Sequence, residues 1–222
     1  RDFTRGAIIS GKIESKKPED KHLNYEESKI LLKALYERLD EGLIYYLLLL
    51  ALTSGMRFGE IVGLTRKDFD FKNNRIHVNK QWDYKNGSGF IPVKNEKSNR
   101  KIFMDEKTMA VFKKLFDSTH DNIHRLVFFN PYSKYKTFSN SYANKVLKNL
   151  LKELKLKQIS VHGLRHTHAS IALYKRNSIY YVSERLGHSD IETTHKYYAH
   201  VVEELRKQDE ENLTNIFKNM FV

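Results

Sequence analysis

The sequence predicts an α+β fold that is mainly helical and carries a small antiparallel β-sheet. Apolar residues recur at helical spacing over most of the chain. Three short β-branched or alternating stretches between residues 75 and 104 interrupt that pattern, and Asn- and Gly-containing turns separate them. Of 222 residues, 40% are hydrophobic and 30% charged, with only 10 Gly and 3 Pro, which excludes a disordered or fibrous protein. We therefore expect one large folded domain with room for short appendages.

The chain is expected to open with a linker and to continue into a buried helical core. Residues 1–22 contain Gly, Ser and a Lys-Lys-Pro-Glu-Asp-Lys run, which is the composition of an interdomain linker. Asn24, followed three residues later by Glu27, resembles a capping box and predicts a helix over about 25–40. Residues 43–53 are apolar on nearly every side, which predicts a helix at the centre of the domain.

Turn residues and a change of period delimit the later elements. The central helix is expected to end at Ser54-Gly55, and a turn is expected at Asn73-Asn74. From residue 105 onward the helical period returns. The expected elements are a helical turn over 57–64, strands over 75–78, 90–93 and 100–104, helices over 106–117, 139–155, 163–175, 178–186 and 190–199, and an amphipathic helix within the C-terminal tail 201–222.

Charge and composition narrow the classes of partner. The 39 Lys and Arg against 27 Asp and Glu give a formal charge of +12, which favours a polyanion: nucleic acid first and a membrane surface second. The longest apolar run, residues 43–52, is half of the roughly 20 residues that a membrane-spanning helix needs. The lack of Cys excludes disulfides, iron–sulfur clusters and thiol catalysis, and fits a reducing cytosol. Because the first residue is Arg1, we expect a fragment of a longer product.

Three polar segments stand out. His162 and Arg165 share one face near the start of a predicted helix, where a phosphate could bind. Arg57 follows the break of the apolar helix, and Glu60 one turn later is its expected partner. The third segment, 185–200, combines a helix stop at a Leu-Gly-His triplet, an N-cap at the following Ser, and two adjacent Tyr. Taken alone, the three segments are better explained as a basic surface helix, an ordinary Arg–Glu pair and packing tyrosines, respectively.

In this order the segments resemble the tyrosine recombinase (phage integrase) family, whose pattern is an early Arg, a Lys on a β-hairpin, His-x-x-Arg, Leu-Gly-His and a Tyr near the C-terminus. The match runs over residues 23–201 and is most similar to integrases of prophages and integrative elements of Gram-positive bacteria. It implies a DNA breaking-rejoining fold, with the catalytic domain over 23–200 and a helical tail over 201–222.

The resemblance also implies roles for single residues. Arg57 and Arg165 would clamp the scissile phosphate, since planar guanidinium forks satisfy its oxygens bidentately. Tyr198 would be the nucleophile that forms a 3′-phosphotyrosyl intermediate, with Tyr197 as the alternative. The remaining implied roles are hydrogen bonding or proton transfer by His162 and His188, and protonation of the leaving 5′ oxygen by Lys94, with Lys97 as the alternative.

The implied reaction is independent of ATP, metals and other cofactors. His162 and His166 have the spacing of a zinc pair, but Gly163 stands where the metalloprotease pattern has Glu, so no metal site is expected. We expect a bacterial, cytoplasmic, nucleoid-associated enzyme that integrates or excises a mobile element. It would be a monomer when free and a homotetramer on double-stranded DNA, with the tail packing in trans or on its own domain. The alternatives are a non-catalytic DNA-binding accessory or regulatory module and, third, a metal-dependent nuclease.

Overall fold

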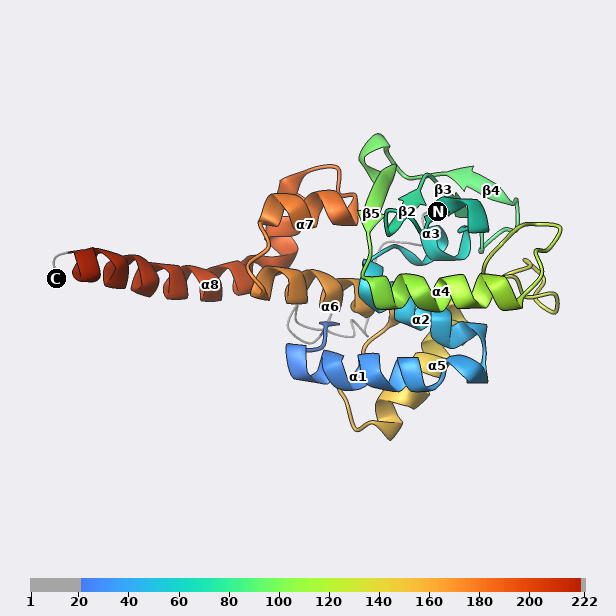
Figure 1. Ribbon diagram of the computed structural model, residues 1–222, viewed down its shortest axis with the longest axis horizontal. Coiled ribbons are helices and arrows are strands. Elements are labelled where there is room, and N and C mark those ends of the chain that lie inside the picture. Colours follow the sequence, from blue (N-terminus) through green and yellow to red (C-terminus); the bar gives the residue numbers. More distant parts are fainter. Residues whose placement is uncertain (1–20, 221–222) are drawn as a thin grey trace, which may run out of the picture.

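The computed structural model describes residues 21–220, and within them all side chains except those of 199–209 and 211. Helices make up most of the domain, and two small antiparallel sheets lie on one side of it (Figure 1). The predicted mainly helical α+β fold is therefore confirmed. Residues 1–20 of the predicted linker lie outside the described part of the chain.

The first helix, α1 (Tyr25–Glu37), begins at the predicted capping box. The Asn24 side chain accepts a hydrogen bond from the Glu27 amide at 2.9 Å, and the Glu27 carboxylate accepts one from the Asn24 amide at 2.8 Å. The helix ends earlier than the predicted residue 40, because a short 3₁₀ turn, Leu39–Glu41, follows it.

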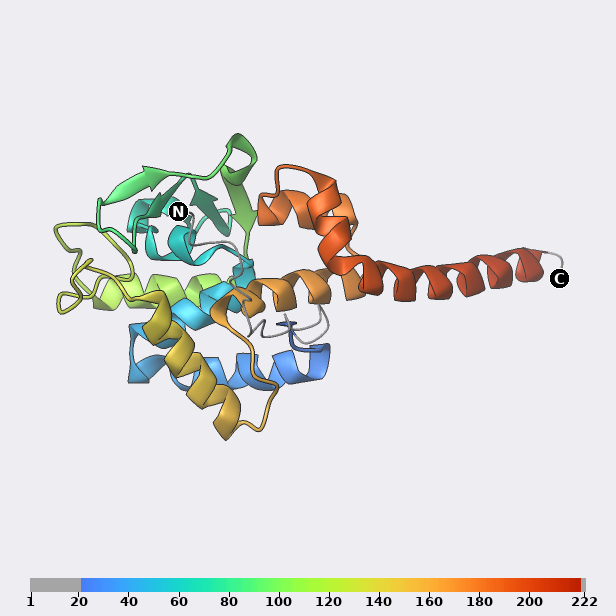
Figure 2. The ribbon, with the colours of Figure 1, turned by 180° about the vertical axis from the view of Figure 1, so that it is seen from behind.

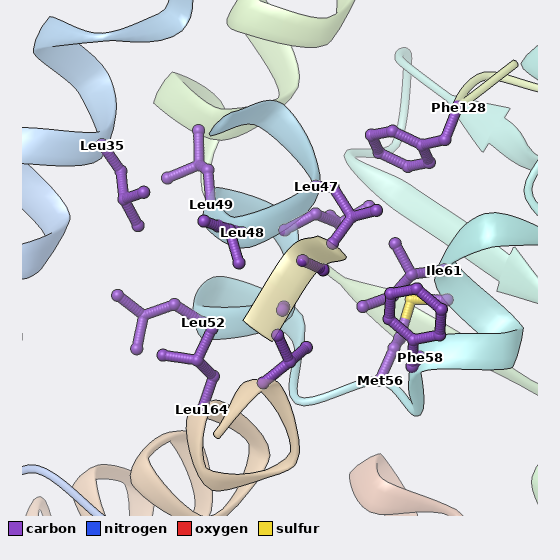
Figure 3. Packing of buried hydrophobic residues seen from close by; sticks show 14 of the residues in the cluster. Leu35, Leu47, Leu48, Leu49, Leu52, Met56, Phe58, Ile61, Phe128 and Leu164 are labelled. Carbon is purple, nitrogen blue, oxygen red and sulfur yellow. The ribbon is translucent and has the colours of Figure 1, made fainter. Parts of the chain in front are cut away.

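The apolar segment forms helix α2 (Leu43–Ser54) at the centre of the core. Leu47, Leu48, Leu49 and Leu50 are all 0% exposed, so neighbours cover every side of this helix. Helices α1, α5 (Asn140–Glu153) and α6 (Val161–Tyr174) and the short helix α3 (Phe58–Val62) all contact α2. Figure 3 shows its leucines among side chains from these elements, including Leu35, Ile61 and Leu164. This packing fixes the position of the residues that follow α2.

The strands form two sheets rather than the single sheet predicted. Strands β1 (Phe69–Asp70), β2 (Arg75–Val78) and β5 (Arg100–Phe103) pair in the order β1-β2-β5. Strand β4 (Phe90–Pro92) instead pairs with the unpredicted strand β3 (Lys80–Trp82). The prediction missed β1 and β3 because strands of two and three residues, with one buried residue each, carry no readable alternation.

Four helices follow close to their predicted positions: α4 (Glu106–Ser118), α5 (Asn140–Glu153), α6 (Val161–Tyr174) and α7 (Ile179–Leu186). Helix α6 begins before the predicted residue 163, because the Ser160 side chain caps it by accepting a hydrogen bond from the Gly163 amide at 3.1 Å. His162 therefore lies in the first turn of α6.

Helix α8 (Ile191–Met220) replaces the two predicted C-terminal helices and is bent at Tyr198, whose φ of −120° and ψ of 18° are not helical. Its N-cap is Asp190 rather than the predicted Ser189, since the Asp190 carboxylate accepts a hydrogen bond from the Thr193 amide at 2.7 Å. Beyond the bend, α8 leaves the domain as a rod (Figures 1 and 2). Within the described residues, no helix combines the length and hydropathy needed to cross a bilayer.

Candidate active site

The candidate site lies where α3, α6 and the α7–α8 junction meet. Arg57 immediately precedes α3, Arg165 lies on α6, and His188 and Tyr198 come from the α7–α8 region. The structure brings these four predicted residues together: Arg165 affects the pKa of both His188 and Tyr198, and Arg57 contacts the residue that precedes His188. His162 completes the group from the first turn of α6, under the influence of both arginines.

Arg57 is held by a buried carboxylate, as its sequence context predicts. Its Nη1 donates to Glu60 Oε1 at 2.8 Å, and its backbone amide donates to Glu60 Oε2 at 2.9 Å. Arg100, which the prediction missed, donates to the same carboxylate at 3.0 Å. Burial alone would raise the pKa of Glu60, but the charges and hydrogen bonds of Arg100 and Arg57 outweigh it and lower that pKa. Glu60 is therefore a fixed anion that orients Arg57.

Arg57 and Arg165, the two arginines predicted to bind the scissile phosphate, each also donate a hydrogen bond to the carbonyl of a glycine that ends a helix. Arg165 Nη1 donates to the Gly55 carbonyl at 2.8 Å, and Arg57 Nη2 donates to the Gly187 carbonyl at 3.0 Å. Gly55 ends α2 and Gly187 ends α7, and both have the left-handed conformation, with φ of 69° and 68°. Carbonyls at helix C-termini lack intrahelical donors and carry partial negative charge, so they are good anchors for guanidinium groups.

Arg165 is buried without an ion-pair partner among the described residues. Burial, and then the charge of Arg57, lowers the pKa of Arg165 to about 9, so this side chain is still cationic at neutral pH. Two neighbouring guanidinium groups, of which one lacks a bonded carboxylate, favour an anion between them. A phosphate diester has the charge and the oxygen geometry to fill that position.

The two predicted histidines are neutral and differ in their surroundings. His188 Nδ1 is 2.7 Å from the Thr194 hydroxyl, so a ligand would meet its Nε2. Burial, and then the charges of Arg165 and Arg57, lowers the pKa of His188 to about 4. His162 lies on the first turn of α6, where partial burial of its ring, and then the charges of Arg165 and Arg57, lower its pKa as well.

Tyr198 lies inward at the bend of α8, whereas Tyr197 is 48% exposed. The Tyr198 hydroxyl is 2.9 Å from His166 Nδ1. Burial raises the pKa of Tyr198, and the charge of Arg165 partly opposes this. The prediction considered His166 only as a zinc ligand. Its position one turn after His162 was the available signal that it belongs to the same face of α6.

The two candidate lysines differ in position. Lys94 is exposed in the connection between β4 and β5. Lys97 lies in a 3₁₀ turn, Glu96–Ser98, and its ammonium donates to the Ser189 carbonyl at 2.6 Å. Lys97 is thus next to the loop that carries His188, whereas Lys94 is not.

A second polar network, not predicted from the sequence, links the elements that carry the site residues. Arg185 Nε donates to His168 Nε2 at 2.8 Å, so His168 must use Nδ1–H to donate to the Leu52 carbonyl at 3.0 Å. Arg185 also donates to the carbonyls of Phe103 at 2.7 Å and Thr53 at 3.2 Å. This network joins the ends of α2 and β5 to α6 and α7. Among the described side chains, which exclude those of 199–209 and 211, no group of three or more His, Asp or Glu could hold a metal ion.

Comparison with known proteins points to one family. The family model described as "Phage integrase family" matches residues 21–204. The integrase of Staphylococcus phage L54a is 30% identical over 175 residues, which make up 73% of this chain and 49% of that protein. A XerC-like tyrosine recombinase of Caldanaerobacter subterraneus is 27% identical over 212 residues, covering 84% of this chain and 53% of that protein.

Solved structures share the fold. The Tn1549 transposon integrase in complex with circular intermediate DNA aligns with a TM-score of 0.72 and 22% identity, covering 90% of this chain and 68% of that one. The XerA recombinase aligns with a TM-score of 0.66 and 22% identity, covering 85% of this chain and 63% of that one. The chain spans about half the length of the curated relatives it matches.

Proposed function

The chain belongs to the phage integrase family, and on that premise we propose that it is the catalytic part of a site-specific DNA recombinase. It cuts and rejoins DNA through a 3′-phosphotyrosyl intermediate and so integrates or excises a mobile element. Residues 23–200 form its catalytic domain and 201–222 its helical tail. The bond energy of the broken phosphodiester is kept in the tyrosyl ester, so rejoining needs no ATP.

The observation that carries this proposal is that Arg165, whose own pKa is lowered by the neighbouring charge of Arg57, also acts electrostatically on the Tyr198 hydroxyl. Attack on a phosphodiester builds negative charge on its non-bridging oxygens, and preorganised guanidinium groups stabilise that charge. Each arginine is already fixed by a glycine carbonyl, and Arg57 also by Glu60 and Ser98, so the remaining N–H groups can meet the phosphate without reorganisation. His162 and His188 Nε2 supply further hydrogen bonds to it.

Departure of the 5′ oxygen requires a proton, which we assign to Lys94 by its place in the family pattern. Lys97 is the competing assignment, supported by its contact with the loop of His188. Either ammonium sits on the connection between β4 and β5 and would reach the phosphate by movement of that connection.

The partner is double-stranded DNA at an attachment site. The net charge of +12 suits a polyanion, and α5 exposes Lys145, Lys148 and Lys152 at helical spacing on one face. We propose a monomer in solution and a homotetramer on DNA, acting in the bacterial cytoplasm at the nucleoid. The described tail residues Leu213, Ile216, Phe217 and Met220 are all more than half exposed, which favours docking on a neighbouring protomer over packing on their own domain.

A non-catalytic DNA-binding module of the same fold is the second candidate, favoured by the basic charge alone. Binding phosphates does not require a buried phenol beside paired guanidinium groups, so the site favours the enzyme.

A nicked suicide substrate carrying the attachment site, incubated with the chain in excess EDTA, tests the proposal. We expect a covalent protein–DNA adduct in denaturing gels, because fixed arginine charges take the place of divalent ions. Binding without any adduct would support the accessory module instead. Cleavage that requires added metal would support a nuclease.

A further inference from the structure

We propose that His166 is a further catalytic residue, the group that takes the proton from Tyr198 during cleavage and returns it during rejoining. The inference rests on the proposed function and deepens it, since the implied site contains His162 and His188 but not His166. His166 Nδ1 lies 2.9 Å from the Tyr198 hydroxyl, within the range required of a general base.

The other histidines in this region, His162, His168 and His188, make contacts with groups other than the Tyr198 hydroxyl. His188 uses Nδ1 for Thr194, and His168 is bonded on both ring nitrogens to Arg185 and the Leu52 carbonyl. The His162 ring packs edge-on against the His166 ring, with centroids 4.8 Å apart, and lies nearer the start of α6. His166 is thus the histidine whose free lone pair faces the phenol, provided that it is neutral.

Its surroundings keep His166 neutral in the absence of DNA. Burial, followed by the charges of His162 and Arg165, lowers the pKa of His166 to about 4. The neutral ring has one protonated and one unprotonated nitrogen, and the tautomer with its proton on Nε2 accepts the phenolic hydrogen on Nδ1. A phosphate bound between Arg57 and Arg165 brings negative charge to the same site, which raises the basicity of His166 when a proton must be accepted.

The step balances as follows. The Tyr198 oxygen forms a bond to phosphorus as its proton moves to His166 Nδ1. The bond from phosphorus to the 5′ oxygen breaks, and that oxygen takes a proton from the lysine general acid. In the reverse reaction the 5′ hydroxyl gives its proton back to the lysine and attacks phosphorus. The bond from phosphorus to the Tyr198 oxygen breaks, and that oxygen regains its proton from His166.

The test measures the rate of adduct formation by His166→Ala on the nicked substrate in EDTA. We expect cleavage at least about 100-fold slower than in the unsubstituted chain, with DNA affinity unchanged. His120→Ala, a change of an exposed histidine on the loop after α4, is the matched control and should cleave normally.

Two rescues separate proton transfer from mere positioning of the tyrosine. A ring-fluorinated tyrosine at position 198 is more acidic and needs less help to lose its proton, so it should restore most of the rate to His166→Ala. Added imidazole should restore part of it. The same fluorinated tyrosine should not restore His162→Ala, because that histidine acts on the phosphate.

Two results would overturn the proposal: normal cleavage by His166→Ala, or a folded, DNA-binding His166→Ala variant that neither rescue improves. Failure of the unsubstituted chain to form any adduct is a different outcome, because it contradicts the proposed recombinase function itself together with this step.

Discussion

Gly55 shows how a single residue positions the site. Its left-handed conformation ends α2 and aims its carbonyl at Arg165. A Cβ at this position would lie 2.7 Å from the His168 ring and 3.0 Å from Leu186. The residue must therefore lack a side chain for two reasons, backbone conformation and space.

We expect Gly55→Ala to lower the free energy of unfolding by roughly 2–4 kcal/mol, through left-handed strain plus overpacking. The matched control is Gly89→Ala, because Gly89 also has a positive φ, of 91°, but nothing within 4 Å of its Cβ position. Urea unfolding of both variants measures the difference. Equal losses would mean that contact with His168 contributes nothing.

A second residue-scale prediction concerns Arg165→Lys. The arginine uses one N–H for the Gly55 carbonyl and can offer others to a phosphate, whereas a lysine ammonium cannot reproduce this planar arrangement. Adduct formation should fall by about two orders of magnitude or more, the size found when a transition-state donor is removed. Gel-shift titration should show a much smaller change in DNA affinity. A cleavage rate within a few fold of normal would argue against a bidentate clamp.

At the scale of elements, the β4–β5 connection contains both candidate general acids, Lys94 and Lys97. Lys94→Ala should slow cleavage by about 10²- to 10⁴-fold. A substrate with sulfur at the 5′ bridging position needs little protonation of its leaving group, so it should be cleaved by this variant at nearly the normal rate. Lys97→Ala, measured in parallel, is the comparison. Rescue of Lys97→Ala alone would transfer the role to Lys97 and its contact with Ser189.

His168 lies at the junction of α2, α6 and α7, and we expect it to make the free energy of unfolding depend on pH. Burial, and then the charge of Arg185, lowers the pKa of His168 to about 3. Unfolded His168 titrates near 6.5, so between pH 6.5 and 3 the unfolded chain binds more protons and stability falls as the pH is lowered. From pH 7.5 to 5.5, His168 should account for a loss of about 1 kcal/mol.

Urea unfolding at pH 7.5, 6.5 and 5.5 measures this loss, in a range where carboxylates have not yet titrated. Glutamine can donate to the Leu52 carbonyl and accept from Arg185 without titrating, so His168→Gln should reduce the pH dependence by the share of His168 and leave the shares of His162, His166 and His188. His120→Gln, a change of an exposed histidine, should leave it unaltered. An unchanged slope in His168→Gln would show that the buried ring does not contribute.

The elements also show what the sequence could and could not predict. Helices α2 and α5 were predicted to within two residues, because α2 is a continuous apolar run and burial of one face of α5 leaves a readable period. The family resemblance was confirmed because its motif keeps a fixed chain order. Arg100 and Arg185 were missed, because their contacts with Glu60 and His168 join segments distant in sequence and leave no periodic signal.

At the scale of the whole molecule, the C-terminal part of α8 has apolar side chains that the rest of the domain does not cover. Its described apolar side chains, Leu213, Ile216, Phe217 and Met220, recur at helical spacing and are exposed on a rod that leaves the body of the domain (Figure 2). Exposed apolar surface of this kind marks an interaction site.

Deleting residues 204–222 should therefore leave the unfolding midpoint of the isolated domain nearly unchanged and weaken cooperative assembly on paired DNA sites. Circular dichroism measures the first quantity, and gel shift or analytical ultracentrifugation with DNA measures the second. Replacing Ile216 and Phe217 with Ser is the milder variant that keeps the helix length. Unfolding of the domain on deletion would show instead that the tail packs on its own chain.

We propose that this molecule cuts DNA with the Tyr198 hydroxyl, which lies 2.9 Å from His166 Nδ1 and within the electrostatic influence of Arg165. Proteolysis of the trapped adduct and mass spectrometry of the DNA-linked peptide, with Tyr197→Phe and Tyr198→Phe in parallel, test it most directly. We expect DNA linked to Tyr198, an adduct with Tyr197→Phe and no adduct with Tyr198→Phe. DNA linked to Tyr197, or an adduct that survives Tyr198→Phe, would contradict it.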